Sequence, residues 1–341
     1  MFGFLNRENK PAAIVPATAP ETLIGCVGKL PLHAEFIKHN LKAREVVALD
    51  NWIQEGVTLL NRLHGESWKQ IFASAPAHRF VFSGAGDEKS VYGLLMPSTD
   101  RSGRSYPFCL FGTSDSAVFK EHQVLLPLAI ENFLGESEAL LAQDWTGSHV
   151  GRLIEAIDTL GRTIPAPERR TLIEAEMNRL RSVTLGQFWR ELLPGTDGEQ
   201  RARFVRTIIG ILQTVSRRSP QRIHWGIRLP LPGKADPLPY LTFWLQLTET
   251  LLRGRSWRGH YFWNTPASGH PARLTLFFRP IPASYFTRLV EPQKADGAIY
   301  DVLDEMARET SDIQRLVNLL GQDEMTLLDA LTLWRSREVM A

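Results

Sequence analysis

Four charged residues on two loops have the side-chain types needed for acid–base chemistry or anion binding. Lys29 and Glu35 follow an apolar run at residues 22–27, and Asp100 and Arg104 lie between two further apolar runs. A carboxylate pair such as Glu35 and Asp100 is able to act as acid and base, while Lys and Arg bind phosphate or carboxylate groups. The spacing alone does not place these side chains together, although neighbouring strands of a sheet would do so.

The first loop, Gly25-Cys-Val-Gly-Lys29, has the composition of a phosphate-binding loop without its spacing. A phosphate-binding loop has four residues between its glycines and a Ser or Thr after its Lys. Here two residues separate the glycines, and Leu30-Pro31 follow the Lys. We therefore expect no nucleotide at this loop, and no cofactor.

The second loop has two competing interpretations. Asp100, Arg101 and Arg104 flank Gly103, and the two guanidiniums are able to bind an anion. Alternatively, the loop is a turn that satisfies itself, in which Asp100 accepts backbone amides and pairs with Arg101 or Arg104. We expect the second arrangement to hold Asp100 in place, with the remaining charges facing a partner.

Other catalytic arrangements are not indicated. Neither Cys26 nor Cys109 lies in a nucleophile motif, and each falls in an apolar run that predicts a buried thiol. Ser98 lacks the Gly-x-Ser-x-Gly pattern of a nucleophile elbow. Histidines are scattered without metal-ligand spacing, at positions 33, 39, 64, 78 and 122. We expect no metal, no catalytic residue and no enzymatic activity.

The elements that position these loops alternate between strand and helix patterns. Short apolar runs predict strands at residues 22–27, 79–82, 91–96 and 106–111, and later at 222–229, 259–263 and 274–278. A stripe from Val46 to Leu63 predicts a helix ended by Gly65, and others follow at 153–160, 204–215 and 240–252. The order predicts an α/β fold, a three-layer α-β-α sandwich around a mixed, largely antiparallel sheet shared by early and late strands, with additional helices.

The same pattern divides the chain into five segments. Residues 1–20 form a flexible tail, 21–145 an N-terminal α/β region and 146–220 a helical region. Residues 221–292 supply late strands and a helix that complete the sheet. Residues 293–341 are predicted to form a C-terminal helical extension, with helices at 313–320 and 325–334.

Composition narrows the class of protein. The 341 residues are 43% hydrophobic and 22% charged, which is typical of a globular chain. A net charge of +2 gives no basic surface for nucleic acid. No apolar run approaches the roughly 20 residues of a membrane-spanning helix, and the N-terminus does not read as an export signal. We expect a soluble, cytoplasmic protein without direct membrane insertion.

Taken together, the motifs between residues 24 and 111 resemble the TagF (ImpM) family associated with type VI secretion. Residues 256–289 resemble its later segments more loosely. Two positions depart from the family pattern, because Ala34-Glu-Phe36 stands where Gly-Asp-Phe is usual and His78-Arg-Phe80 where Trp-Arg-Phe is usual. The motifs are Gly28-Lys-Leu-Pro31, Glu35-Phe-Ile37, Trp52-Ile53, Gly65-Glu-Ser-Trp68, Pro76 with Arg79-Phe80, and Gly93-Leu-Leu-Met-Pro-Ser-Thr-Asp-Arg-Ser-Gly-Arg104 followed by Tyr106-Pro-Phe108.

The resemblance implies a cytoplasmic α/β protein that represses type VI secretion after translation by binding the forkhead-associated scaffold protein Fha. The C-terminal helices are a candidate site for a second partner. The alternative is an enzyme or a small-ligand switch that uses Lys29, Glu35, Asp100 and Arg104 in a deep pocket. The residues expected to carry partner binding are Gly28, Lys29, Pro31, Glu35, Arg79, Pro97, Ser98, Asp100, Arg101, Gly103 and Arg104.

Overall fold

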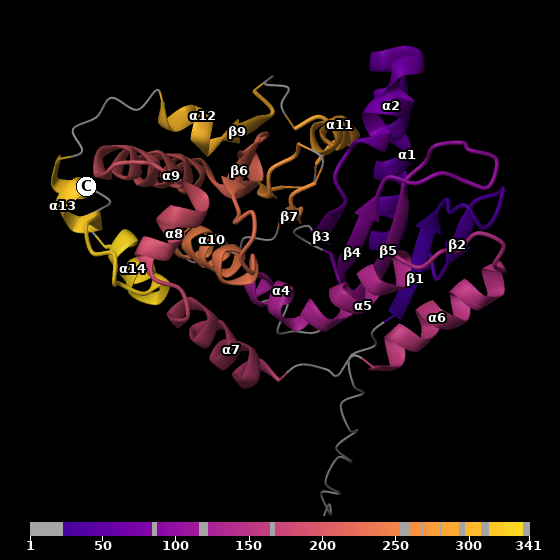
Figure 1. The fold of residues 1–341 in the computed structure, drawn as a ribbon, viewed down its shortest axis with the longest axis horizontal. Helices are drawn as coiled ribbons and strands as arrows, with labels where there is room; N and C mark the ends of the chain where they lie inside the picture. The colour runs from indigo at the N-terminus through magenta and orange to yellow at the C-terminus, as the bar shows by residue number, and fades with distance from the viewer. Residues whose placement is uncertain are drawn as a thin grey trace, which may run out of the picture.

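The computed structural model of the protein is organised around one long sheet with helices on both sides (Figure 1). It describes residues 23–83, 87–115, 122–163, 168–252, 259–267, 269–279, 281–292, 297–307 and 314–336. The flexible tail predicted for residues 1–20 lies outside the described residues. Within the described ranges, no helix has the length and apolar character needed to cross a membrane.

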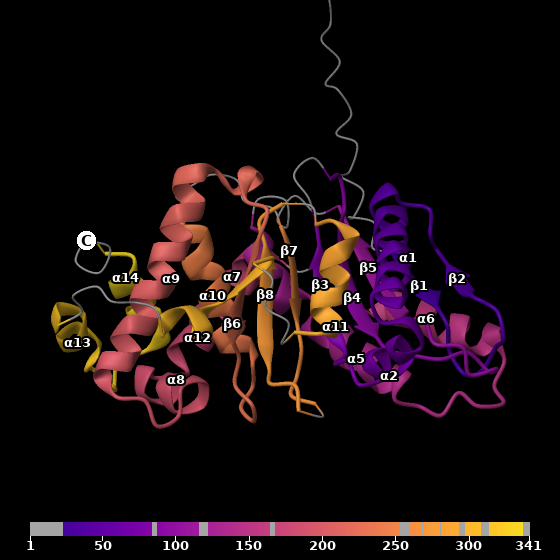
Figure 2. The ribbon, with the colours of Figure 1, turned by 90° about the horizontal axis from the view of Figure 1, so that it is seen from above.

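The sheet has nine strands in the order β2-β1-β5-β4-β3-β7-β8-β6-β9. Figure 2 shows them side by side from β2 at one end to β6 near the other. Every pair is antiparallel except β6–β9. The strands are β1 (Leu23–Gly28), β2 (Ile37–His39), β3 (His78–Phe82), β4 (Ser90–Met96), β5 (Phe108–Ser114), β6 (Gly226–Pro230), β7 (His260–Trp263), β8 (Arg273–Phe277) and β9 (Ile299–Asp301).

Strands from the two ends of the sequence meet at the pair β3–β7, where Phe80 lies opposite Phe262. The predicted single sheet with early and late strands is therefore confirmed, as is the α/β class with helices on both faces. The alternation of side chains along each strand sends one set of residues to each face.

One face is covered by α1 (Arg44–His64), α2 (Trp68–Ala73) and α11 (Phe286–Val290). The predicted apolar stripe of α1 buries Val46, Leu49 and Ile53 against the sheet, and Gly65 ends the helix. Gly56 sits directly against Phe286, so the absence of a side chain lets α1 and α11 approach each other closely.

The other face is covered by several helices that share a second apolar core. Helices α5 and α6 pack on β4 and β1, and the buried helix α10 packs against α7, α9 and α14. Aromatic rings of Trp189, Trp244 and Trp334 stack in the helical part of this core. The helices are α4 (Leu126–Ala129), α5 (Glu131–Leu141), α6 (Val150–Thr163), α7 (Arg169–Arg181), α8 (Leu185–Leu192), α9 (Gly198–Arg218), α10 (Leu238–Leu251), α12 (Val302–Met306), α13 (Gln314–Leu320) and α14 (Leu327–Trp334).

Three details differ from the sequence-based prediction. Strand β5 begins at Phe108 rather than Tyr106, because Pro107 has no N–H for the ladder and its carbonyl accepts the Lys29 amide at 3.3 Å. The three-residue strands β2 and β9 were not predicted, since runs this short carry almost no periodic signal. Strand β9 also adds the segment after residue 293 to the sheet.

Candidate functional site

The loops that follow β1 and β4 are joined by a buried ion pair. Lys29 Nζ lies 2.8 Å from Asp100 Oδ2, and the two side chains are 9% and 0% exposed. Gly28 makes this approach possible, because its φ of 132° is rarely adopted by other residues and its Cα lies against the Pro107 carbonyl. The two loops that were predicted separately therefore form one unit.

Both oxygens of the Asp100 carboxylate are fully engaged within this unit. Oδ1 accepts the Ser102 hydroxyl at 2.7 Å and the Ser102 and Arg104 amides at 2.9 and 3.0 Å. Oδ2 accepts Arg104 Nε at 2.7 Å in addition to Lys29. The self-satisfied turn expected at Asp100 is thus present, with Arg104 as its guanidinium partner. Among the described residues, Arg101 contributes a main-chain bond from its amide to the His33 carbonyl and no side-chain bond.

This arrangement fixes the charge of Asp100. Burial alone would raise the pKa of the carboxyl, but hydrogen bonds from Lys29, Ser102 and Arg104 hold that pKa well below its usual range. The carboxylate therefore stays ionised at physiological pH. It has no free oxygen for a substrate proton, and Lys29 is committed to it.

A smaller set of side chains remains exposed around the buried pair. Glu35 and Arg104 are 74% and 55% exposed, and their charged ends are 3.6 Å apart. Phe36 is 44% exposed, packs edge-on against Tyr106 at 4.7 Å, and lies 5.0 Å from Lys29 Nζ. We call the exposed residues Glu35, Phe36, Arg101 and Arg104 the loop face.

The loop face corrects one expectation from the sequence. Lys29 was expected to present its charge to a partner together with Glu35 and Arg104, but Lys29 and Asp100 form an interior ion pair that holds the loops. Their burial follows from the Asp100 turn, which folds back over β1 and brings the carboxylate onto the ammonium. Glu35 and Arg104 are the members of the four that face outward.

An apolar groove of about 330 Å³ opens beside these loops. Three of the expected residues, Pro31, Pro97 and Ser98, lie in its wall. Lys29, Glu35, Asp100 and Arg104 do not line it, so the charged set and the groove are adjacent but separate features. The other lining residues are Leu30, Phe72, Ala73, Met96, Thr99, Ser105, Leu141, Gln143, Asp144 and Trp145.

Gly103 and Arg79 have different places in the structure. Gly103 adopts a φ of 81° in open space and donates its amide to the Asp100 carbonyl, so it shapes the turn. Arg79 lies on β3 and makes a bidentate pair with Glu138 on α5, at 2.7 and 2.9 Å. Arg79 therefore ties the sheet to a helix instead of joining the loop face.

Sequence reasoning missed Phe36 as a surface residue and Trp145 as part of the groove. The signal for Phe36 was present, because a large apolar residue between Glu35 and a short buried segment is unusual in a polar loop. The sequence around Trp145 carries no such signal. In the structure its Nε1 donates to the Leu140 carbonyl, and the residue resembles any other core Trp.

The comparisons with known proteins agree with the motifs in the first half of the chain. Residues 25–160 match the family model of the TagF N-terminal domain, described as type VI secretion system-associated. The crystal structure of PA0076 from Pseudomonas aeruginosa PAO1 is similar over 80% of this chain and 96% of that one, with a TM-score of 0.46 and 17% identity. No curated protein matches the chain.

Residues 25–160 are therefore similar to the N-terminal domain of a type VI secretion system-associated family, and the chain has an α/β fold. This match confirms the resemblance seen in the loop motifs. The Lys29–Asp100 pair, the loop face and the residues that line the groove all fall within the matched residues.

Proposed function

We propose that the protein is a cytoplasmic, post-translational negative regulator of type VI secretion that binds the forkhead-associated scaffold protein Fha through its loop face. The observation that carries this proposal is the exposed trio Glu35, Phe36 and Arg104, held on a rigid base by the buried Lys29–Asp100 pair. Aromatic residues and Arg are enriched in protein interfaces, and other charged side chains commonly lie at the polar rim.

The geometry favours a binding protein over an enzyme. An enzyme or ligand switch built on Lys29, Glu35, Asp100 and Arg104 needs reactive groups that are free to meet a substrate. Lys29 and Asp100 instead form an ion pair with each other, and Arg104 forms a second ion pair with Asp100. Glu35 and Arg104 extend into solvent, but Arg104 is already bonded to Asp100, and a single exposed carboxylate is a poor acid–base catalyst.

The groove beside the loops extends the surface available to a protein partner. Its wall is mostly apolar and includes Pro31, Met96 and Trp145. A partner segment that contacts the loop face would reach this groove without crossing other elements, because Pro31 follows Lys29 directly and Pro97 precedes the Asp100 turn. Apolar burial in the groove would supply affinity, and the charges would supply orientation.

The test is co-purification of tagged Fha with this chain, together with measurement of type VI secretion when the chain is deleted or overproduced. We expect deletion to raise secretion and overproduction to lower it. Glu35→Lys and Arg101→Glu should each reduce bound Fha and weaken repression, because both side chains are exposed and neither bonds the buried Lys29–Asp100 pair; Glu35 contacts the exposed Arg104 guanidinium at 3.6 Å. Glu55→Lys and Arg62→Glu make the same charge changes on exposed positions of α1 and serve as matched controls.

Two outcomes would contradict the proposal. If secretion is unaffected by deletion and overproduction, the chain is not a repressor. If Glu35→Lys and Arg101→Glu retain Fha as well as the α1 controls do, the loop face is not the binding surface. The segment after Pro292 then becomes the next candidate, and it remains a candidate site for a second partner in either case.

A further inference from the structure

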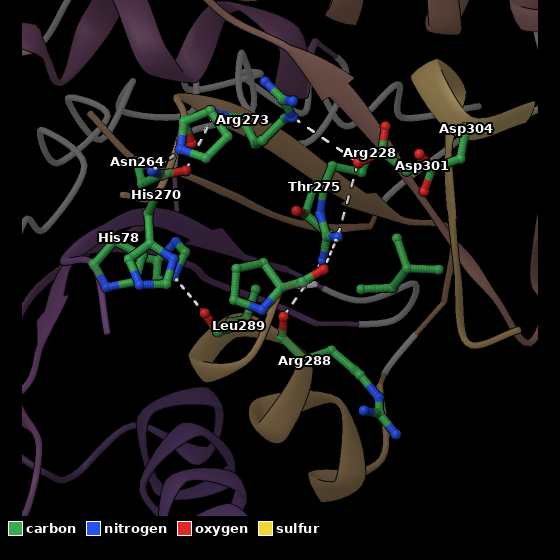
Figure 3. Close-up of a pocket in the computed structure, with 14 residues that line it drawn as sticks. His78, Arg228, Asn264, His270, Arg273, Thr275, Arg288, Leu289, Asp301 and Asp304 are labelled. Atoms are coloured by element: carbon green, nitrogen blue, oxygen red, sulfur yellow. Dashed lines mark hydrogen bonds and ion pairs between the residues drawn. The ribbon is translucent and has the colours of Figure 1, made fainter. Parts of the chain in front are cut away.

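A second cavity, of about 340 Å³, lies over the junction between the early and late strands (Figure 3). Its floor is formed by polar side chains of the sheet, among them His78 on β3 and Thr275 on β8. These residues lie two positions from Phe80 and Phe277, which pack in the core beneath α1. Side chains two apart on a strand share a face, so the cavity interrupts an otherwise apolar face of the sheet.

Strand register sets charged residues in a row across this floor. Thr275 on β8 lies opposite Arg228 on β6, and Arg228 lies opposite Asp301 on β9. Arg273 enters from the next position of the same face of β8. Figure 3 shows Arg228 and Arg273 on either side of Asp301, with His78, Asn264 and His270 grouped at the opposite side of the cavity.

Among the residues that the structure describes, the two arginines keep N–H donors without an acceptor. Arg228 is 7% exposed; it bonds the main-chain carbonyl of Pro292 and, at 3.4 Å, that of Arg288. Its Nη1 is 3.9 Å from Asp301 Oδ2, and Arg273 Nε is also 3.9 Å from that oxygen. Since 3.9 Å is too long for a hydrogen bond, a guanidinium with five N–H donors retains several for another acceptor.

His78 adds a buried acceptor to the same cavity. Its Nε2 lies 3.2 Å from the Leu289 carbonyl and must carry the proton of that bond. Its Nδ1 is then an acceptor, and it is buried with no hydrogen-bond partner among the described residues, as is Nδ1 of His270. Burial lowers the pKa of His78 to about 4, which keeps the ring neutral. Orphaned polar atoms of this kind are rare in protein interiors.

We propose that this cavity binds a small hydroxylated organic anion, a phosphate ester or a carboxylate. Arg228 and Arg273 would bind the anionic group, because a guanidinium fork matches two oxygens of a phosphate or carboxylate. His78 Nδ1 would accept a hydrogen bond from a hydroxyl of the same molecule. The volume suits a ligand of that size, and the three lining arginines outnumber the lining carboxylates of Asp301 and Asp304.

Arg273 is the residue that separates ligand binding from a structural role. Arg228 and His78 also hold the last carbonyls of α11, so their removal would disturb that helix. Within the described part of the chain, the Arg273 guanidinium makes one hydrogen bond, to the neighbouring Ala272 carbonyl, besides its long contact with Asp301. Changing it should therefore leave the fold intact.

The experiment is isothermal titration of the full chain with ribose 5-phosphate and with gluconate, beside inorganic phosphate and uncharged ribose. We expect at least one of the two hydroxylated anions to bind at one site per chain, more tightly than inorganic phosphate, and ribose not to bind. Arg273→Gln should weaken this binding roughly tenfold or more, as expected for a lost charge-assisted hydrogen bond. Arg190→Gln, at an exposed position of α8, is the matched control.

Each other outcome would overturn the proposal. Failure of both hydroxylated anions to bind, or equal loss in Arg273→Gln and Arg190→Gln, means that the cavity does not select such a ligand. Binding of a glutamate-rich peptide in place of both small anions would assign the arginines to an acidic segment of a protein. If Arg273→Gln proves unstable by its melting temperature, Arg273→Lys keeps the charge without the planar fork and should still weaken binding.

Discussion

Replacing Gly28 by Ala tests the close packing that creates the candidate site. The Gly28 φ of 132° disfavours any side chain, and an added Cβ would collide with the Pro107 carbonyl oxygen and lie 2.8 Å from Phe108 Cα. Strain at such a φ costs about 1–3 kcal/mol, and forcing an atom into a packed region costs about 1–3 kcal/mol more. Gly28→Ala should thus destabilise the fold by about 2–6 kcal/mol.

Gly103→Ala is the matched control for this prediction. Gly103 also has a positive φ, of 81°, but an added Cβ would meet no atom within 4 Å. It should cost only the backbone strain, about 1–2 kcal/mol. Both variants create the same side chain on the same two-loop unit, so their difference isolates the collision with Pro107.

Calorimetric melting of the wild type and both variants measures the effect. An unfolding entropy near 2.1 cal/mol/K per residue converts 1 kcal/mol into a shift of about 1.4 °C for a chain of this length. We expect a decrease of about 3–8 °C for Gly28→Ala and of about 1–3 °C for Gly103→Ala. Equal decreases would refute the reasoning, because they would mean that the β1 end and the Pro107 loop separate without cost.

Three further substitutions have definite expected outcomes. Burial raises the pKa of Glu176 to about 7, so between about pH 4.5 and pH 7 the folded state holds a proton that the unfolded state has lost. The free energy of unfolding should therefore fall as pH rises through this range. Glu176→Gln should remove up to about 3 kcal/mol of that fall, measured by urea unfolding at pH 5 and pH 8. Burial lowers the pKa of His260 to about 3, so stability should fall as pH decreases below about 6.5, and His260→Phe should reduce that fall in acid unfolding curves. Asp100→Asn should leave Lys29 buried without its countercharge and lower the melting temperature, whereas Glu55→Gln, an exposed control, should not; equal melting of the two would contradict the described role of the pair.

The sequence predicted the elements of the fold well where the apolar pattern was long. The stripe from Val46 to Leu63 and its stop at Gly65 correspond to α1, and the run at 91–96 to β4. Strand β2 could not be found in the same way, because three residues do not form a readable period and its pairing with β1 depends on a long-range contact. That early and late strands share one sheet was inferred from element order, whereas the particular pairing of β3 with β7 was not predicted.

The candidate site was only partly predictable, for a physical reason. Glycine and charge marked the two loops, and the turn chemistry of Asp100 was predictable from its neighbours. The burial of Lys29 was not, because it results from the way the Asp100 turn folds over β1. The polar cavity could not be predicted from the sequence. Arg228 and His78 are isolated polar residues within their own strands, and the strand register across the sheet brings them to one cavity.

The β3–β7 pair also has a consequence for how the chain folds during synthesis. Strand β3 is complete at Phe82, but its partner β7 begins only at His260. At about 5–20 residues per second, the ribosome needs roughly 10–35 s to supply that partner. During this interval the N–H and C=O groups along one side of β3 have no strand to pair with, and Phe80 lacks Phe262. A nascent chain of this protein therefore presents an open strand edge for many seconds, which makes it a substrate for chaperones that cover such edges.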